Sequence, residues 1–338
     1  MKKSIITSLL LLIVFICNAQ PDIAALLETA RTFNRQGDHA NALLVLNRAL
    51  QQKPDDMNVQ RDIAYTHYLQ RDYVKALEII KPLLDREDAD VQTFQVGGNI
   101  YKAVEEVKDC DKMYKKALKK FPSSGALHSE YGELLWAKRD MAAIDMWEKG
   151  IEADPNHSGN YYNAAKYYYY TTNKVWGLVY GEIFVNLESY STRTTEIKNL
   201  LLEGYKKFYT QAAALKKADP KKKNLFEEAF TETMNKQASL ASTGITVDNL
   251  VMIRTRFILD WFETKNKKFP FRLFEYHQQL LKSGMFEAYN QWLLGTVNNV
   301  VQYQNWTSTH SEEHNEFNRF QRNRVFKMPP GQYYQNKL

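Results

Sequence analysis

The feature of this sequence that most constrains its fold is a self-similarity with a period of 34 residues. Three positions recur in phase: a small residue, a large one four positions later, and another small or apolar residue three positions after that. The four copies are Ala42-Leu46-Ala49, Ala76-Ile80-Leu83, Cys110-Tyr114-Ala117 and, one residue early, Ala143-Trp147-Gly150. A coiled coil would instead repeat every seven residues without breaks, so the pattern indicates a repeated pair of helices.

Each copy also contains the signals that separate two helices. Pro54, Pro122 and Pro155 close three copies, and proline ends a helix because it lacks a backbone N–H and clashes with the preceding turn. An earlier helix carries its own in-phase pair, which reads Ala30-Phe33, Ala64-His67, Gly98-Tyr101 and Gly132-Leu135 in the four copies. Between the two helices stand the polar turns Gln36-Gly37-Asp38, Gln70-Arg71-Asp72 and Lys138-Arg139-Asp140.

With these four copies over residues 23–155, the sequence resembles the tetratricopeptide repeat family. A fifth and weaker copy covers 158–187, with Ala165, Tyr168, Gly177 and Gly181 in the matching positions. The resemblance implies an all-α fold, a right-handed α-solenoid of helix-turn-helix repeats. It also implies an interaction or scaffolding module that binds a partner protein or peptide, with no catalytic activity and no cofactor.

The repeat fades after residue 187, but helical periodicity continues. Apolar faces at helical spacing predict helices over 192–215, 224–238, 247–264, 271–283 and 286–305. Within the last segment, Ala288, Trp292 and Gly295 repeat the spacing of the fourth copy. We therefore expect repeats over 20–188, followed over 189–338 either by a C-terminal α-helical domain or by divergent repeats that continue the stack.

The N-terminus has the pattern of a secretory signal peptide. Met1-Lys2-Lys3 is positively charged, residues 5–16 are apolar, and Cys17-Asn18-Ala19 places small residues where signal peptidase reads them. The apolar run is too short for a comfortable membrane span, and no later run approaches one. The pattern predicts cleavage after Ala19 and an exported protein, periplasmic or secreted. Lipidation of Cys17 is the alternative, although the bulky Ile16 fits a lipobox poorly.

Charge and cysteine content narrow the possible partners. The formal net charge is only +6, without the clustered basic face of a nucleic-acid binder. The one dense basic run, 216–223, is broken by Asp219-Pro220 and is interpreted as a solvated loop. Removal of the signal peptide leaves Cys110 alone, which excludes an internal disulfide. Its register with Ala42 and Ala76 predicts a buried packing residue.

The resemblance places the partner-binding groove on the first helix of each pair. Residues three and four positions apart share one face of a helix. Along the five expected first helices this face carries Arg31, Arg61, Tyr65, Tyr68, Gln92, Gln95, Asn99, Lys102, Ser129, Glu133, Trp136, Tyr162, Lys166 and Tyr169. Tyrosine, tryptophan and arginine are enriched in binding hot spots, so we expect a ligand groove here, with Arg61, Tyr65, Tyr68, Trp136 and Tyr169 as its anchors.

Some members of the family hold a C-terminal carboxylate with lysines and asparagines on these helices. Leu27 and Arg31 stand where the first such pair would fall. The match fails there, so this specificity is not transferred.

One motif supports a different class of function, a metal-dependent hydrolase in the C-terminal half. His310-Ser311-Glu312-Glu313-His314 fits the His-x-x-Glu-His pattern of one metalloprotease class. Two histidines four apart on a helix share a face and can hold zinc. The pattern is short and few residues follow it, so we expect an ordinary polar helix and no metal site.

Overall fold

The computed structural model describes residues 22–171, 173–215 and 224–335 of the chain. Every regular element in these ranges is a helix, which confirms the predicted all-α fold. The helices fall into two compact units, one ending at Met113 and the other beginning at Tyr114. Among the described helices, none is both long and apolar enough to cross a membrane. The predicted signal peptide, residues 1–19, and the basic run 216–223 lie outside the described residues.

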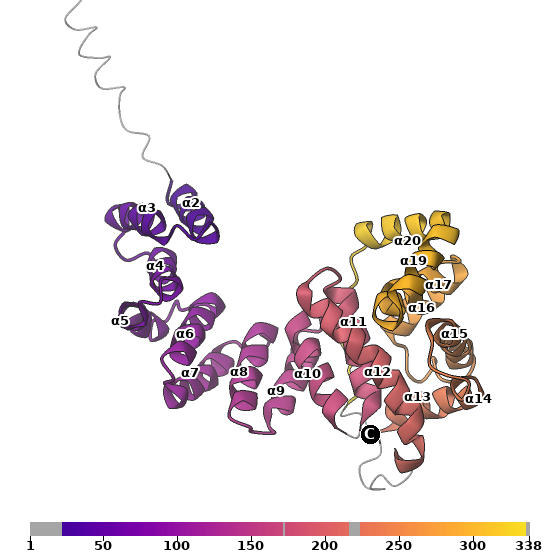
Figure 1. The fold of residues 1–338 in the computed structure, drawn as a ribbon. Coiled ribbons are helices and arrows are strands. Elements are labelled where there is room, and N and C mark those ends of the chain that lie inside the picture. Colours follow the sequence, from indigo (N-terminus) through magenta and orange to yellow (C-terminus); the bar gives the residue numbers. More distant parts are fainter. Residues whose placement is uncertain (1–21, 172, 216–223, 336–338) are drawn as a thin grey trace, which may run out of the picture. The chain divides into compact units, whose positions relative to one another are not determined.

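The first unit consists of helix pairs joined by short turns (Figure 1). These helices are α2 (Ile23–Arg35), α3 (His39–Gln52), α4 (Met57–Leu69), α5 (Tyr73–Leu84), α6 (Val91–Ala103) and the start of α7 (Val107–Lys120). α2 packs on α3 and α4 packs on α5, and α3 and α5 also pack on the first helix of the following pair. The predicted stack of helix-turn-helix repeats is therefore present.

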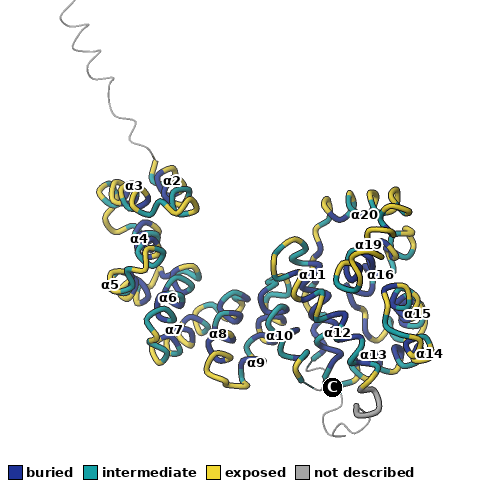
Figure 2. The backbone as a smooth tube through the Cα atoms, in the orientation of Figure 1, coloured by how far each residue is buried: buried dark blue, intermediate teal, exposed yellow. Residues whose placement is uncertain are grey.

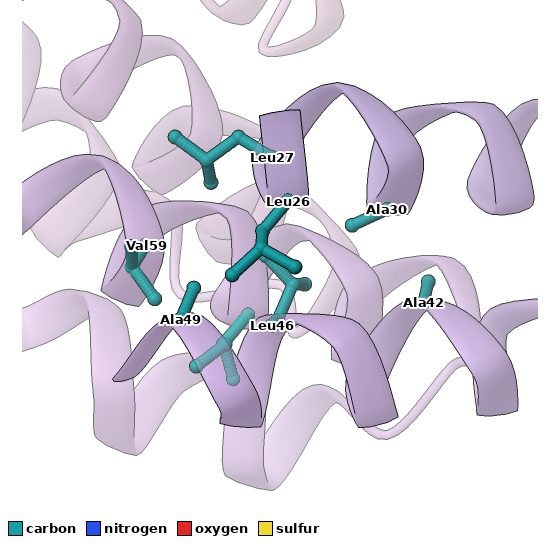
Figure 3. Close-up of a cluster of buried hydrophobic side chains, with 8 residues drawn as sticks. Leu26, Leu27, Ala30, Ala42, Leu46, Ala49 and Val59 are labelled. Carbon is teal, nitrogen blue, oxygen red and sulfur yellow. The ribbon is translucent and has the colours of Figure 1, made fainter. Parts of the chain in front are cut away.

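The small residues of the repeat lie where helices approach closely. Ala30, Ala42 and Ala49 are at most 1% exposed and pack with Leu46 and Val59 in one cluster (Figure 3). Buried and exposed residues alternate along the helices of this unit, as an amphipathic pattern requires (Figure 2).

Cys110 occupies the same small-residue position in the third copy. It is fully buried, and its Sγ lies 3.9 Å from the carbonyl oxygen of Gly98 on α6. The prediction of a buried packing residue is confirmed.

The turns inside the pairs share one backbone conformation. Gly37 has φ of 79°, and Arg71 takes 63° at the equivalent position of the second copy. In each case the next residue is an aspartate that caps the second helix: Asp38 accepts from the backbone N–H of Asn41, and Asp72 from that of Lys75. A residue with positive φ, followed by the capping residue of the second helix, lets the chain reverse direction in a short turn.

After the end of α7, the second unit continues with two further pairs and a long helix. In chain order these helices are α8 (Gly125–Ala137), α9 (Ala143–Ala153), α10 (Ser158–Tyr170), α11 (Lys174–Leu187) and α12 (Thr192–Leu215). Gly132 leaves no space for a side chain, because the indole of Trp147 occupies the position that a Cβ would take. α12 packs on both α10 and α11, as the first helix of a sixth pair would.

A group of shorter helices follows (Figure 1). They are α13 (Leu225–Asn235), α14 (Ala238–Ala241), α15 (Val247–Thr264), α16 (Arg272–Lys282), α17 (Phe286–Asn290), the π-helix η2 (Gln291–Gly295), α18 (Thr296–Asn298), α19 (Val300–Thr309) and α20 (Ser311–Asn323). The single helix expected over 286–305 is wrong, because the backbone breaks at Asn299, where φ is −160°. Its side chain accepts from the N–H groups of Val301 and Gln302 and starts a new helix.

An aromatic core holds α13, α15 and α16 together. Phe226 is fully buried, and its ring centroid lies 5.4 Å from that of Trp261 and 5.0 Å from that of Tyr334. Beside this core, the buried carboxylate of Glu182 pairs with Arg254 and accepts from Tyr289 at 2.7 Å. These contacts join α11 to helices that follow it by many residues.

The last described residues, 324–335, return along the unit without regular structure. Met328 exchanges two hydrogen bonds with the side chain of Asn156, at 2.9 and 3.0 Å. Gln335 donates to the hydroxyl of Tyr168, and Tyr334 donates to the carbonyl of Pro270 at 2.7 Å. We call residues 324–335 the C-terminal strap, because they tie the repeat helices α9 and α10 to the later helices.

Candidate functional site

In both units the first helices of the pairs lie side by side. α4 packs on α2 and on α6 in the first unit, and α10 packs on α8 and on α12 in the second. Neighbouring first helices therefore form one face in each unit, and we call these the first-helix faces. The residues that the sequence predicts for the groove lie on these helices.

The first-helix face of the first unit carries a pair of stacked tyrosines. The rings of Tyr65 and Tyr68 are 6.0 Å apart between centroids, with an angle of 20° between their planes. Tyr65 is 36% exposed, and Tyr68 also contacts the ring of Tyr73 on α5. Contacts with neighbouring rings restrict the side chains before any ligand arrives, so binding costs them little conformational entropy.

Polar groups surround the tyrosine pair. Arg31 on α2 is half exposed and pairs with Asp62 on α4 at 3.0 Å. On α6, Gln92 is exposed, and the face continues through the half-buried side chains of Gln95, Asn99 and Lys102. Amide side chains both donate and accept, as the backbone of an extended peptide requires.

Arg61 is placed elsewhere than the sequence predicts. It is only 3% exposed, and its guanidinium donates to both carboxylate oxygens of Asp90, at 3.2 and 2.9 Å. Burial opposes ionisation of Asp90, but hydrogen bonds from Thr93 and the charge of Arg61 hold its pKa below the usual value. Because Asp90 also caps α6, Arg61 joins two repeats and offers little surface to a partner.

Ser129 is also buried, at 3% exposure. Its carbonyl accepts from the indole N–H of Trp147, and its hydroxyl lies 3.5 Å from the side-chain nitrogen of Asn163 on α10. Helix spacing selected Arg61 and Ser129 because it shows only which side chains share a face of their own helix. It does not show that residues of the next pair cover the N-terminal part of that face. We leave both residues out of the candidate surface.

Trp136, on α8, is 44% exposed on the second unit's first-helix face. Its ring lies 5.8 Å from that of Tyr167 and 6.1 Å from that of Trp147. One turn earlier, the exposed carboxylate of Glu133 accepts from Asn163 at 3.1 Å. Trp136 is thus an exposed aromatic surface on a packed base.

Tyr162 and Lys166 belong to a charged cluster between α10 and α12. Lys166 pairs with Glu196 at 2.7 Å and donates to the hydroxyl of Tyr162 at 3.1 Å, and this hydroxyl donates to Glu196. The guanidinium of Arg193 lies 4.9 Å from the ring centroid of Tyr162. Burial opposes ionisation of Glu196, but hydrogen bonds from Lys166 and Tyr162 lower its pKa.

The partners of this cluster on α12 were missed by sequence reasoning. Arg193, Glu196 and Lys207 follow the last recognisable repeat, and Lys207 lies 3.9 Å from the ring centroid of Tyr169. The helical spacing of these residues along 192–215 was the only signal in the sequence. Without a recognisable repeat there, the sequence did not show which face of this helix lies beside the preceding first helix.

The two histidines of the metalloprotease-like motif do not share a helix. His310 lies between α19 and α20, where it stacks on Trp306 at 5.0 Å, while His314 lies within α20. The ring of His314 is within 3.0 Å of the side-chain nitrogen of Asn318. Over the described ranges, no group of three or more histidine, cysteine or acidic residues is placed to hold a metal ion.

Comparison with known proteins agrees with the repeat pattern. Residues 34–95 match a family model described as a tetratricopeptide repeat. No curated protein matches the sequence.

Solved structures of low sequence identity are similar in part. A thermophilic TPR protein from Thermus thermophilus is 16% identical, with a TM-score of 0.46 over 54% of this chain and 100% of that one. YrrB, a TPR protein with an unusual peptide-binding site, is 17% identical, with a TM-score of 0.37 over 53% and 93%. The TPR domain of P58(IPK) is 13% identical, with a TM-score of 0.28 over 89% of each chain.

Proposed function

Because this chain is a tetratricopeptide-repeat protein, we propose that it is an interaction module that holds an extended segment of a partner protein on its first-helix faces. The observation that carries the proposal is the stacked pair Tyr65–Tyr68, in which Tyr65 is exposed and Tyr68 contacts the ring of Tyr73. Rigid aromatic side chains on a packed base are the usual anchors of protein interfaces.

The remaining chemistry of the faces fits a peptide better than a small metabolite. Amides on α6 suit a peptide backbone, and Arg31, Glu133 and Lys166 supply charges of both signs. Exposed charges of this kind select among partners and contribute little affinity. The aromatic anchors therefore account for affinity in this proposal, and the charges account for specificity.

We also propose that the partner is met after export, on the strength of the signal-peptide pattern in residues 1–19. Mass spectrometry of the protein isolated from the cell envelope and medium tests this directly. The proposal expects a mature N-terminus at Gln20, and an intact Met1 in protein from the cytoplasm alone would contradict it.

We also propose that residues 189–338 cap the repeats of 20–188. The support is α11, whose residues are buried on nearly all sides, and α12, which covers it. Repeat arrays need an atypical end to hide their last apolar face.

Photocrosslinking in the cell tests the binding face. A photoreactive phenylalanine analogue replaces Tyr65 or Trp136 on the first helices, and Leu44 or Val74 on the second helices as controls. Val74 is 69% exposed and Leu44 59%, so the analogue at the control positions is as accessible to a partner as at Tyr65 and Trp136. The proposal predicts one defined crosslinked protein from Tyr65 and Trp136 and none from Leu44 and Val74. Equal crosslinking from both sets, or from the controls only, would contradict it.

A further inference from the structure

The interruption of the helix expected over 286–305 opens a pocket in the second unit, away from the first-helix faces. Its cavity volume is about 260 Å³. Residues from the start of α15, from η2 and α18, and along α19 line it. The residues that matter for its chemistry are Asp248, Gln291, Asn298, Gln302, Tyr303 and Trp306.

The backbone around the pocket has an unusual geometry. η2 adds a π-helical turn that ends at Gly295, and π-helical turns are frequent at functional sites. A Cβ at Gly295 would lie 2.5 Å from Cδ2 of Tyr303 and 2.9 Å from Oε1 of Gln291. Glycine therefore lets the tyrosine ring and the glutamine amide approach the same point of the backbone.

Gln291 is the most informative side chain of the pocket. It is 5% exposed, and none of the hydrogen bonds among the described residues uses its side-chain amide. Its amide is not among the fully enclosed polar atoms that lack a partner, so it faces the open space of the cavity and not the protein interior. Because Gln291 lines the cavity, a ligand in the pocket would supply the missing donor and acceptor.

The walls of the pocket combine amides with two fixed aromatic rings. The indole N–H of Trp306 donates to Glu287 at 2.7 Å, and the hydroxyl of Tyr303 lies 3.4 Å from His314. These contacts hold the rings in place. Sugar hydroxyls donate and accept as amides do, and the C–H groups of a sugar ring can pack on an aromatic face.

Charge argues against an anionic ligand. Among the residues that the structure describes, no lysine or arginine lines the pocket, and Asp248 is the one charged residue in its wall. The starts of α15 and α19 are already capped: Thr246 accepts from the N–H of Asn249, and Asn299 accepts from those of Val301 and Gln302. The N–H groups that usually bind phosphate at a helix start are therefore partly occupied.

Size favours a small ligand over a peptide segment. Pockets for drug-sized molecules span roughly 300–1,000 Å³, so a cavity of about 260 Å³ is slightly smaller. We infer that this pocket binds a neutral sugar of one or two rings, with Gln291 and Asn298 contacting its hydroxyls and Tyr303 or Trp306 its ring. The sugar is either a free saccharide or the end of a glycan chain.

Saturation-transfer NMR of the full protein tests the ligand class. The probes are the methyl glycosides of glucose, galactose, mannose and N-acetylglucosamine, with maltose and lactose as two-ring sugars. Glucose 6-phosphate and triglycine amide represent the anionic and peptide alternatives. The inference predicts saturable transfer to at least one neutral sugar and none to the two alternatives.

A glycan array of neutral oligosaccharides separates the two sources. Binding of free glycosides identifies a free sugar, whereas binding only to glycan ends identifies a chain terminus. Absence of neutral-sugar binding in both assays, or preferential binding of the phosphate or the peptide, would overturn the inference.

Matched variants tie the binding to the pocket. Gln291→Met keeps the length of the side chain and removes the amide, and Asn298→Ala tests the wall at a half-buried position that endangers the fold less. Each is expected to weaken sugar binding about tenfold. Val301→Ala is the control, because Val301 is 64% exposed, neighbours the pocket and does not line it. Unchanged affinity in both pocket variants, with the melting temperature preserved, would also overturn the inference.

Discussion

In the unit that ends at Met113, the described core consists of contacts between neighbouring helices, whereas the unit that begins at Tyr114 adds contacts between residues far apart in sequence. Leu46 packs with residues of its own pair and the next. Asn156, by contrast, bonds to Met328, 172 residues later, and Asn186 bonds to Tyr289, 103 residues later. The same helix pair is thus a nearly independent building block in one unit and part of a larger core in the other.

This difference predicts two responses to damage. A repeat array approximates a sum of pairs and nearest-neighbour interfaces, so the first unit should lose structure locally. The second unit should unfold as a whole when one of its long-range contacts is removed.

The largest effect is expected at the buried ion pair of Glu182 and Arg254, whose side chains are each 4% exposed. Burial opposes ionisation of Glu182, but Arg254 together with His277 lowers its pKa to about 2. Arg254→Met leaves that carboxylate buried without its partner, which should cost about 3–5 kcal/mol of unfolding free energy. Urea unfolding followed by amide hydrogen exchange should show loss of protection throughout the second unit.

Two further variants make this prediction specific. The double change Glu182→Leu with Arg254→Met removes both charges and should recover most of the lost stability. Lys265→Met, which breaks the more exposed pair with Glu232, should cost less than about 1 kcal/mol. If Arg254→Met cost no more than Lys265→Met, the buried pair would not organise this unit.

The second prediction concerns pH and the C-terminal strap. Burial raises the pKa of Glu148 from 4.5 to about 7, despite a hydrogen bond from Tyr168 at 2.5 Å. The folded state therefore holds a proton that the unfolded state releases. The contribution of Glu148 to stability should be fully present below pH 4.5 and fall by up to about 3 kcal/mol by pH 7.

Glu148→Gln isolates this contribution from other titrating groups. The variant keeps a neutral side chain near Tyr168, which in turn accepts from Gln335 of the strap. Thermal melts between pH 4.5 and pH 8 should show a gain of stability in the variant that grows with pH. A parallel pH dependence of the two proteins would contradict the raised pKa.

Cys110 probes the local packing of the first unit. Cys110→Leu should overpack the close approach to Gly98 and cost about 1–3 kcal/mol, while Cys110→Ala should be milder. Because the damage is local, hydrogen exchange should change in α6 and α7 and leave the second unit protected. Rapid labelling of the native thiol by a small reagent would contradict its burial.

The smallest effect is expected in the turns that both units share. Arg71 in the first unit and Arg139 in the second have φ of 63° and 59°, a conformation that favours glycine. Arg71→Gly and Arg139→Gly should each raise stability by less than about 1 kcal/mol, since relief of strain is partly offset by chain entropy. Gly37→Ala, at the equivalent turn, should lower it. A loss of stability in either glycine variant would show that the arginine side chain stabilises the turn.

The two units also differ in how much of them the sequence predicted. Positions set by nearest neighbours, such as Ala42 and Cys110, followed from the period, because each helix pair meets its neighbour in the same way. The break at Asn299 did not follow, since it depends on Tyr303 packing against Gly295 in the folded unit. The C-terminal strap was missed for the same reason, because hydrogen bonds between residues far apart in the sequence produce no periodic pattern in it.

The residues of the candidate site also differ in how well the sequence predicted them. Positions such as Tyr65 and Trp136, which are exposed, were predicted from helix spacing after the family resemblance had placed the groove on the first helices. Arg61 was misplaced because its partner Asp90 belongs to the next repeat. The α12 residues around Tyr162 were missed because the repeat pattern had faded there.

Once photocrosslinking has identified the partner, its affinity and the stability of each variant are measured together. Tyr65→Ala, Tyr68→Ala, Trp136→Ala and Tyr169→Ala remove aromatic surface from the first-helix faces, and Val74→Ala is the exposed control on a second helix. Calorimetric titration should show losses of about 1–3 kcal/mol of binding free energy for the aromatic variants. Melting temperatures should stay close to wild type, and Val74→Ala should change neither quantity. Unchanged affinity in all four aromatic variants would show that the first-helix faces are not the binding site.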